Sequence, residues 1–251
     1  MLILLTNDDG ILAPGIHALR QAFEPLAEVI LVAPDRERSA TGHGITMHKP
    51  LRVEQYTFGR SQGYAVSGTP ADCVKLALEQ LLPKQPDLVI SGINRGANLG
   101  TDILYSGTVS GALEAIINGI PAMAVSLDVR HKGNYEVAAE FATKMASFLT
   151  QHPLPKNTLM NINVPDLDKH DIKGIKVAKL GLRRYIDCVE ERKDPRGKSY
   201  YWLSGKLLDE LEPETDVWAV SQGYIALTPV HYDLTNHHIL PSLQGLANLN
   251  W

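Results

Sequence analysis

The sequence has few of the features that mark secreted proteins, proteins stabilised by structural zinc, or membrane proteins. It contains two cysteines in 251 residues, Cys73 and Cys188, and neither belongs to a CxxC pair. This argues against a disulfide scaffold or a structural zinc site and favours the reducing cytoplasm. The longest apolar runs are far too short to span a membrane, and residues 1–5 are too few for a signal peptide. We therefore expect a cytoplasmic protein that does not associate with membranes.

An excess of charge of one sign is also missing. The chain has 24 Lys and Arg against 28 Asp and Glu, which gives a net charge of −4, and it contains no long basic run. A nucleic acid is therefore not expected as the main partner, and any anion site must be local. The hydrophobic content of 44% is ordinary for a globular protein. A chain of this length can bury roughly 75% of its unfolded surface, so it needs no covalent staples.

The first half of the sequence predicts an α/β fold with a mainly parallel sheet. Residues 2–5 and 29–33 are apolar throughout, as expected for strands that are covered on both faces. Between them, Ile16, Leu19 and Phe23 recur at helical spacing, so strand, helix and strand form a right-handed βαβ unit.

Beyond about residue 170 the alternation of strands and helices stops. We expect strands at residues 175–178, 216–220 and 224–230, and two charged extended runs near residues 184–190 and 199–203 that form a hairpin. A long, charged hairpin has little of its own to bury, and isolated two-stranded ribbons are marginal in water. We therefore expect it to pack on another subunit.

Oxygen-bearing side chains follow three of the predicted strands. Asp8 and Asp9 come directly after the first strand, Ser39 lies in the loop after the second, and Asn94 follows the strand at residues 86–91. In open α/β sheets, ligands bind at the carboxyl ends of the strands. Two adjacent carboxylates repel each other unless a cation lies between them, and Mg²⁺ and Mn²⁺ select oxygen ligands. The alternative is that Asn-Asp-Asp-Gly is only a favourable turn sequence.

A glycine-rich stretch at residues 91–100 precedes a helix that is predicted to begin near Ser106. It contains three glycines and two asparagines, which allow the backbone to approach a ligand closely. The helix start itself carries Ser106, Gly107 and Thr108, so free N–H groups and the helix dipole favour bound phosphate. The alternative is an ordinary capped helix. Together with the three strand ends, this start favours a site for a metal and a phosphate.

Five motifs in one order resemble the signatures of the SurE family, bacterial stationary-phase survival proteins that act as metal-dependent nucleotidases. They are TNDDG at residues 6–10, APDRERS at 33–39, GTPADCV at 68–74, SGIN at 91–94 and YSGTV at 105–109. The resemblance covers the whole chain and extends to NINVP at residues 161–165 and DLT at 233–235.

The resemblance implies a single domain over residues 1–251. A Rossmann-like three-layer core would occupy about residues 1–180. The hairpin, strands and tail of about residues 181–251 would be exchanged between the subunits of a homodimer or homotetramer. It also implies hydrolysis of nucleoside 5′-monophosphates to nucleoside and phosphate, with some activity on 3′-nucleotides and short polyphosphates.

The resemblance further assigns the site. The metal ligands would be Asp8, Asp9, Ser39 and Asn94, which hold one divalent ion, Mg²⁺ or Mn²⁺, in each subunit. Phosphate contacts would lie near Asn98 and at residues 106–108.

Some catalytic roles stay open at this point. Asp8 or Asp9 could be a phosphorylated nucleophile instead of a metal ligand, although no partner lysine is evident. His43, in a glycine-flanked loop, is the candidate that would protonate the leaving group, and its alternative role is structural or solvent-facing. A rival of another class is a nucleotide-binding regulatory protein that has the same fold and little turnover.

Overall fold

The computed structural model describes residues 1–129, 133–186, 189–203 and 205–249. Strands of the main sheet are β1 (Leu2–Thr6), β2 (Glu28–Pro34), β3 (Val53–Phe58), β4 (Ser61–Val66), β5 (Leu88–Arg95), β6 (Ala122–Asp128), β7 (Thr158–Pro165), β8 (Ile175–Val177) and β13 (Ile225–His231). Helices are α1 (Pro14–Phe23), α2 (Pro70–Leu76), α3 (Gly107–Ile117), α4 (Tyr135–Gln151) and α5 (Asp216–Ser221). Other helical segments are η1 (Ala77–Leu81), η2 (Gly100–Leu104) and η3 (Leu240–Asn248).

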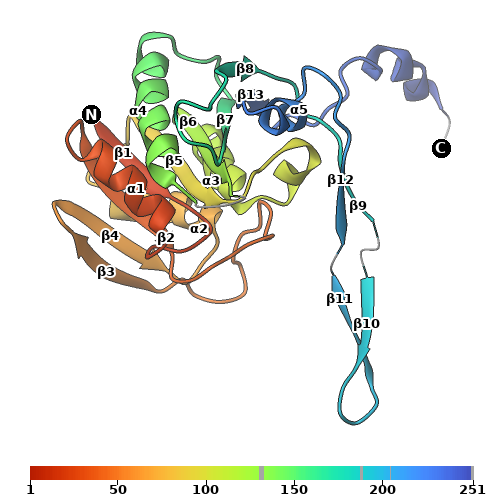
Figure 1. Cartoon of the computed structure of the whole chain (residues 1–251), viewed down its shortest axis with the longest axis horizontal. Coiled ribbons are helices and arrows are strands. Elements are labelled where there is room, and N and C mark those ends of the chain that lie inside the picture. The colour runs from red at the N-terminus through yellow and green to blue at the C-terminus, as the bar shows by residue number, and fades with distance from the viewer. Residues whose placement is uncertain (130–132, 187–188, 204, 250–251) are drawn as a thin grey trace.

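The described strands of the body form one sheet in the order β3-β4-β2-β1-β5-β6-β7-β13-β8, and helices cover both of its faces (Figure 1). Neighbouring strands from β4 to β7 run parallel, while β3 and β13 run antiparallel to β4 and β7. The predicted α/β fold with a mainly parallel sheet is thus confirmed.

Alternation along β1 explains the layers. All five residues of β1 are buried, and successive side chains of a strand point to opposite faces. Ile3 and Leu5 belong to the core that α1 and α4 complete, while Leu2 and Leu4 belong to the core that α2 and α3 complete. The apolar run therefore correctly indicated a central strand. The residues after β1 lie at the carboxyl edge of the sheet.

The strand predicted at residues 216–220 is wrong, because this segment forms helix α5. Thr215 caps the helix and accepts a hydrogen bond from the N–H of Trp218. A short apolar run does not separate a buried strand from a buried helix turn, so the cap was the better signal.

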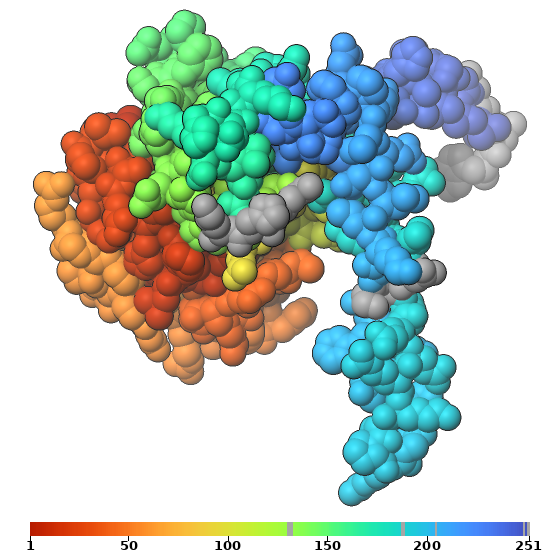
Figure 2. Space-filling view, in the orientation of Figure 1, coloured from red at the N-terminus to blue at the C-terminus, as the bar shows by residue number. Residues whose placement is uncertain are grey.

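The C-terminal hairpin forms an arm that extends away from the body (Figure 2). Its base pairs β9 (Arg183–Ile186) with β12 (Lys206–Asp209), and its outer part pairs β10 (Val189–Lys193) with β11 (Ser199–Leu203), all antiparallel. Residues 187–188, including Cys188, and 204 lie outside the described ranges. No helix in the described part of the chain combines the length and apolar character that crossing a membrane requires.

Candidate metal and phosphate site

The turn after β1 brings Asp8 and Asp9 to the carboxyl edge of the sheet. Asn7 closes this turn on Gly10: its Nδ2 donates to the Gly10 carbonyl at 2.9 Å, and its Oδ1 accepts from the Gly10 N–H at 3.2 Å. Gly10 has a φ of +101°, in the region that favours glycine. The N–H of Arg38 donates to the Asp8 carbonyl at 2.7 Å, which holds the loop after β2 against the turn.

The two carboxylates are costly to ionise where they lie. The pKa of Asp8 is raised to about 6: burial raises it most, a hydrogen bond from the Thr108 hydroxyl lowers it, and the negative charge of Asp9 raises it. Burial also raises the pKa of Asp9, although its Oδ2 accepts from the Arg95 N–H at 3.1 Å. The backbone N–H groups of Asp8 and Thr108 also stabilise the Asp8 carboxylate. A divalent cation relieves this electrostatic cost.

An open depression of about 560 Å³ joins the candidate residues. From the sequence-predicted set, it is lined by Asp8, Asp9, Ser39, Asn94, Asn98 and Ser106. It is also lined by residues that the sequence did not single out: Glu37, Ala40, Arg95, Ala97, Asp102, Tyr105 and Tyr185. The structure therefore brings together all four predicted metal ligands, which come from three separate strand ends.

Ser39 and Asn94 are both oriented by neighbours. The Ser39 hydroxyl donates to Glu37 Oε1 at 2.6 Å, which directs its oxygen lone pairs elsewhere. Asn94 Nδ2 donates to the Gly96 carbonyl at 2.8 Å, so its Oδ1 lies on the other side of the amide. With Asp8 and Asp9, these groups offer two carboxylate, one hydroxyl and one amide oxygen. This donor set fits Mg²⁺ or Mn²⁺ and has no soft ligand that would select zinc or copper.

Asn98 is held from behind by two asparagines that sequence reasoning missed. Its N–H donates to Asn163 Oδ1 at 2.8 Å, and its carbonyl accepts from the Nδ2 atoms of Asn161 and Asn163 at 2.9 and 3.0 Å. Asn98 Nδ2 donates one hydrogen to Ser126 Oγ at 2.8 Å and keeps a second for a ligand. The signal for both was present, because asparagines alternate with apolar residues in a strand that is otherwise core.

The start of α3 packs directly on Asp8. Ser106 is the N-cap and accepts from the Val109 N–H at 3.0 Å. A β-carbon at Gly107 would lie 2.7 Å from the Asp8 β-carbon, so glycine is needed here for the approach of the carboxylate. The Thr108 hydroxyl donates to Asp8 Oδ1. The side-chain positions of residues 107 and 108 therefore serve Asp8, and the N–H of Thr108 also stabilises the Asp8 carboxylate. The N–H of Gly107, in the first turn of the helix, is a donor that a phosphate could use.

His43 does not line the depression. Its Nε2 lies 2.9 Å from Oε2 of Glu114, a buried residue of α3 whose Oε1 also accepts from Lys75 Nζ at 3.3 Å. The bond with His43 is the main reason that the pKa of Glu114 lies below its ordinary value. This contact anchors the loop that carries Ser39 and supports the structural alternative for His43.

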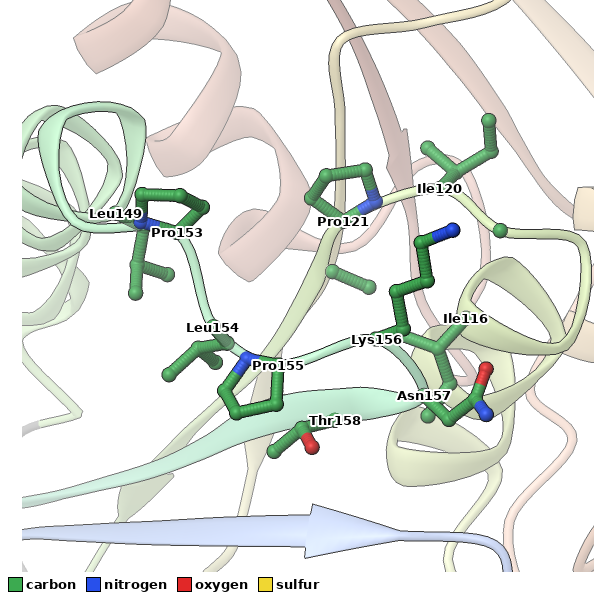
Figure 3. A pocket seen from close by; sticks show the side chains of 12 residues that line it. Ile116, Ile120, Pro121, Leu149, Pro153, Leu154, Pro155, Lys156, Asn157 and Thr158 are labelled. Atoms are coloured by element: carbon green, nitrogen blue, oxygen red, sulfur yellow. The ribbon is translucent and has the colours of Figure 1, made fainter.

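Two other features of the surface are less suited to the chemistry. A cavity of about 250 Å³, lined by side chains such as Ile116, Pro121, Leu149 and Leu154, lies where β6 and β7 begin (Figure 3). This is the amino end of the parallel strands, opposite the crevice in which α/β sheets bind ligands.

The second feature is a group of three exposed residues, Asp168, His170 and Asp171, whose ligand atoms lie within 4.8 Å of one another. An ion pair at 3.5 Å between His170 and Asp171 accounts for part of this proximity. Solvent already stabilises these charges, in contrast to those of Asp8 and Asp9.

Comparisons with known proteins agree with this geometry. A family profile described as "Survival protein SurE" matches residues 3–187. The chain belongs to the SurE family. A SurE relative from Carboxydothermus hydrogenoformans, named 5′-nucleotidase SurE, is 56% identical over an alignment that covers 97% of this chain and 95% of that protein. Another of the same name, from Moorella thermoacetica, is 52% identical and spans 100% of this chain and 98% of that protein.

The SurE fold is confirmed by a solved structure. The crystal structure of the SurE protein from Aquifex aeolicus matches with a TM-score of 0.85 at 42% identity. The match covers 99% of this chain and 100% of that one, so it includes the C-terminal arm and tail as well as the core. The resemblance inferred from the five motifs is thus borne out over the whole chain.

Proposed function

We propose that this SurE protein is a metal-dependent phosphomonoesterase that hydrolyses nucleoside 5′-monophosphates to nucleoside and phosphate. The observation that carries the proposal is one depression in which the buried carboxylate of Asp8 and the half-buried carboxylate of Asp9 meet the start of α3. The first feature is suited to a divalent cation and the second to a phosphate. The relatives named 5′-nucleotidase SurE indicate the class of phosphate ester.

Asp8, Asp9, Ser39 and Asn94 would hold one Mg²⁺ or Mn²⁺ ion. Such an ion, when bound, supplies Lewis-acid activation of the phosphoryl group and of water. Asn98 and the N–H groups at the start of α3 bind the phosphoryl oxygens and stabilise the charge that gathers on them during in-line attack. The contacts of Asn161 and Asn163 keep Asn98 rigid, so no reorganisation is needed as the charge develops.

The hydrogen bonds to Asp8 and Asp9 also bear on the choice of nucleophile. The N–H of Arg95 donates to one oxygen of Asp9, and the hydroxyl of Thr108 donates to one oxygen of Asp8. These bonds hold both carboxylates in place, as expected for metal ligands. Among the described residues lining the depression there is no lysine to support an aspartyl-phosphate intermediate. Attack by water is therefore our proposal, and hydrolysis of 3′-nucleotides and short polyphosphates would follow the same route.

Phosphate release tests the function against its rival, a regulatory protein that binds nucleotide with little turnover. Purified protein should release phosphate from AMP or GMP when Mg²⁺ or Mn²⁺ is present, and EDTA should abolish the release. Tight nucleotide binding with no release of phosphate, whether Mg²⁺ or Mn²⁺ is supplied, would favour the regulatory protein.

We also propose that the arm and tail make the contacts of a homodimer or homotetramer in the cytoplasm. Large side chains of the arm are exposed, including Trp202 at 56% and Leu203 at 86%. Exposed apolar surface of this extent marks an interaction site. The buried free thiol of Cys73 agrees with a reducing compartment.

A further inference from the structure

Two tyrosines from distant parts of the sequence stand at the same depression as the candidate metal ligands. Tyr105 follows η2 and is 65% exposed, and Tyr185 belongs to β9 at the base of the arm and is 50% exposed. Large aromatic side chains that serve only to pack a protein core are normally buried. Their exposure at a site for a small ligand therefore needs an explanation of its own.

The base of the arm is fastened to η2 by charged groups. The Arg183 side chain is 7% exposed and donates from Nη1 to Asp102 Oδ2 at 3.1 Å and from Nε to Asp209 Oδ1 at 2.8 Å. The Tyr185 hydroxyl donates to the same Asp102 oxygen at 2.9 Å. One arginine thus neutralises two carboxylates that would otherwise repel a phosphate ester, and the Tyr185 ring is fixed at its tip.

Backbone contacts complete the attachment. Asp216, fully buried at the start of α5, accepts from the N–H of Gly100 and the N–H of Gly181, each at 2.8 Å. The Thr101 hydroxyl donates to the Arg183 carbonyl at 2.6 Å. The segments that carry Tyr105 and Tyr185 are therefore held together as one unit, although they lie about 80 residues apart in the sequence.

We propose that Tyr105 and Tyr185 form the nucleobase subsite of the depression, with their ring faces stacked against the base. This proposal rests on the proposed nucleotidase function, because it assumes that the phosphate lies at Asp8 and the start of α3. The volume of about 560 Å³ falls in the range of about 300–1,000 Å³ that ligand pockets occupy. Every base has a π-face, so stacking tolerates different bases and binds the larger purines better.

Arg183 acts in this subsite as a positioning residue. It contacts Asp102 and Asp209, while Asp102 in turn holds the tip of Tyr185. Arg183→Lys would keep the charge and lose the fork that reaches both carboxylates. We expect it to weaken AMP binding less than removal of either ring does.

The test compares two ligands that share a phosphate and a sugar but differ in the base. Both ligands are used as phosphonate analogues that cannot be hydrolysed, and their binding to the wild type, Tyr105→Ala and Tyr185→Ala is measured by titration calorimetry with Mn²⁺ present. We expect each variant to weaken AMP binding about tenfold, equivalent to about 1.4 kcal/mol. Binding of ribose 5-phosphate should stay unchanged.

Tyr185→Phe and Tyr201→Ala are the controls. Phenylalanine keeps the ring and loses only the bond to Asp102, so it should retain most of the preference for AMP. Tyr201 is an equally exposed tyrosine on β11 that does not line the depression, so its removal should leave the ratio of the two affinities unchanged. Light scattering of each variant shows whether the assembly is altered.

The outcomes separate the subsite from the function. Equal weakening of both ligands, or none for AMP, would overturn the nucleobase subsite and leave the nucleotidase proposal intact. A wild-type protein that binds AMP more tightly than ribose 5-phosphate but releases no phosphate would refute the nucleotidase proposal. In that case the same titrations still decide whether the rings read the base.

Discussion

The carboxyl edge of the sheet and the projecting arm are built in opposite ways. At the edge, Asp8 is 5% exposed, and its neighbours in sequence and space bond to one another. On the arm, every residue of β10 and β11 is exposed, including the aromatic side chains. At the edge, packing and hydrogen bonds hold charged groups in place, whereas on the arm apolar side chains are exposed.

This difference shows where each region obtains its stability. The edge is stabilised by a core that the same chain completes on both faces of the sheet. The outer arm has only one ladder of its own, and isolated two-stranded ribbons are marginal in water. Changes at the edge should therefore alter chemistry within one subunit, and changes on the outer arm should alter assembly.

The largest effect should come from Asp8→Asn or Asp9→Asn. Loss of a carboxylate weakens metal affinity, and we expect kcat/KM for AMP to fall by about 10²–10³-fold or more. Circular dichroism should show an unchanged fold, because asparagine has nearly the same shape. Retention of most of the activity at saturating Mn²⁺ would contradict the assignment of these residues as ligands.

Removal of the outer arm should change the assembly. Residues 189–203 are replaced by a short glycine linker, which leaves Arg183 and Tyr185 at the base. We expect light scattering to report a smaller mass or aggregation, because the exposed side chains of β10 and β11 are lost as a contact surface. An active oligomer of unchanged mass would show that the outer arm is not an interface.

The pH should set the stability of the metal-free edge. Burial raises the pKa of Asp8 from 3.8 to about 6, so between these values the folded protein holds a proton that the unfolded chain has released. Stability therefore falls as the pH rises through this window, by about 3 kcal/mol for a shift of this size. Urea unfolding in EDTA should show this loss in the wild type and a smaller one in Asp8→Asn, where only the raised pKa of Asp9 remains.

The same proton competes with the metal. Below about pH 6 an ion must displace it from Asp8, so apparent Mn²⁺ affinity should fall about tenfold for each unit of pH. Titration of Mn²⁺ by calorimetry at several pH values measures this slope. An affinity that stays constant down to pH 5 would mean that Asp8 is not a ligand.

The smallest effects should come from Ser39→Ala and Asn94→Ala, which remove one neutral ligand each. We expect the Mn²⁺ concentration for half-maximal activity to rise roughly tenfold, with turnover restored at high metal. Thr41→Ala is the matched control in the loop of Ser39, since its hydroxyl donates to the Arg38 carbonyl. Equal shifts for Ser39→Ala and Thr41→Ala would point to loop distortion in place of ligand loss.

Much of the fold and the convergence of the candidate ligands could be predicted, because both depend on local patterns. An apolar run such as residues 2–5 specifies a covered strand, and the polar residues after it must then lie at the carboxyl edge. The helix at residues 216–221 was predicted wrongly because the apolar run was weighed above its local cap, Thr215. The support of Asn98 depends on partners that are distant in sequence, namely Asn161 and Asn163.

The sequence by itself determined the α/β class and the family and supplied the candidate oxygen ligands, because side-chain periodicity and motif order are properties of the chain. Only the tertiary structure decided that Gly107 makes room for Asp8, that His43 is bound to Glu114, and that Tyr185 and Tyr105 line the same depression. These facts are distances between segments that the sheet order and the arm attachment bring together. Local propensity does not encode such distances, because they arise from packing among elements that are far apart in the chain.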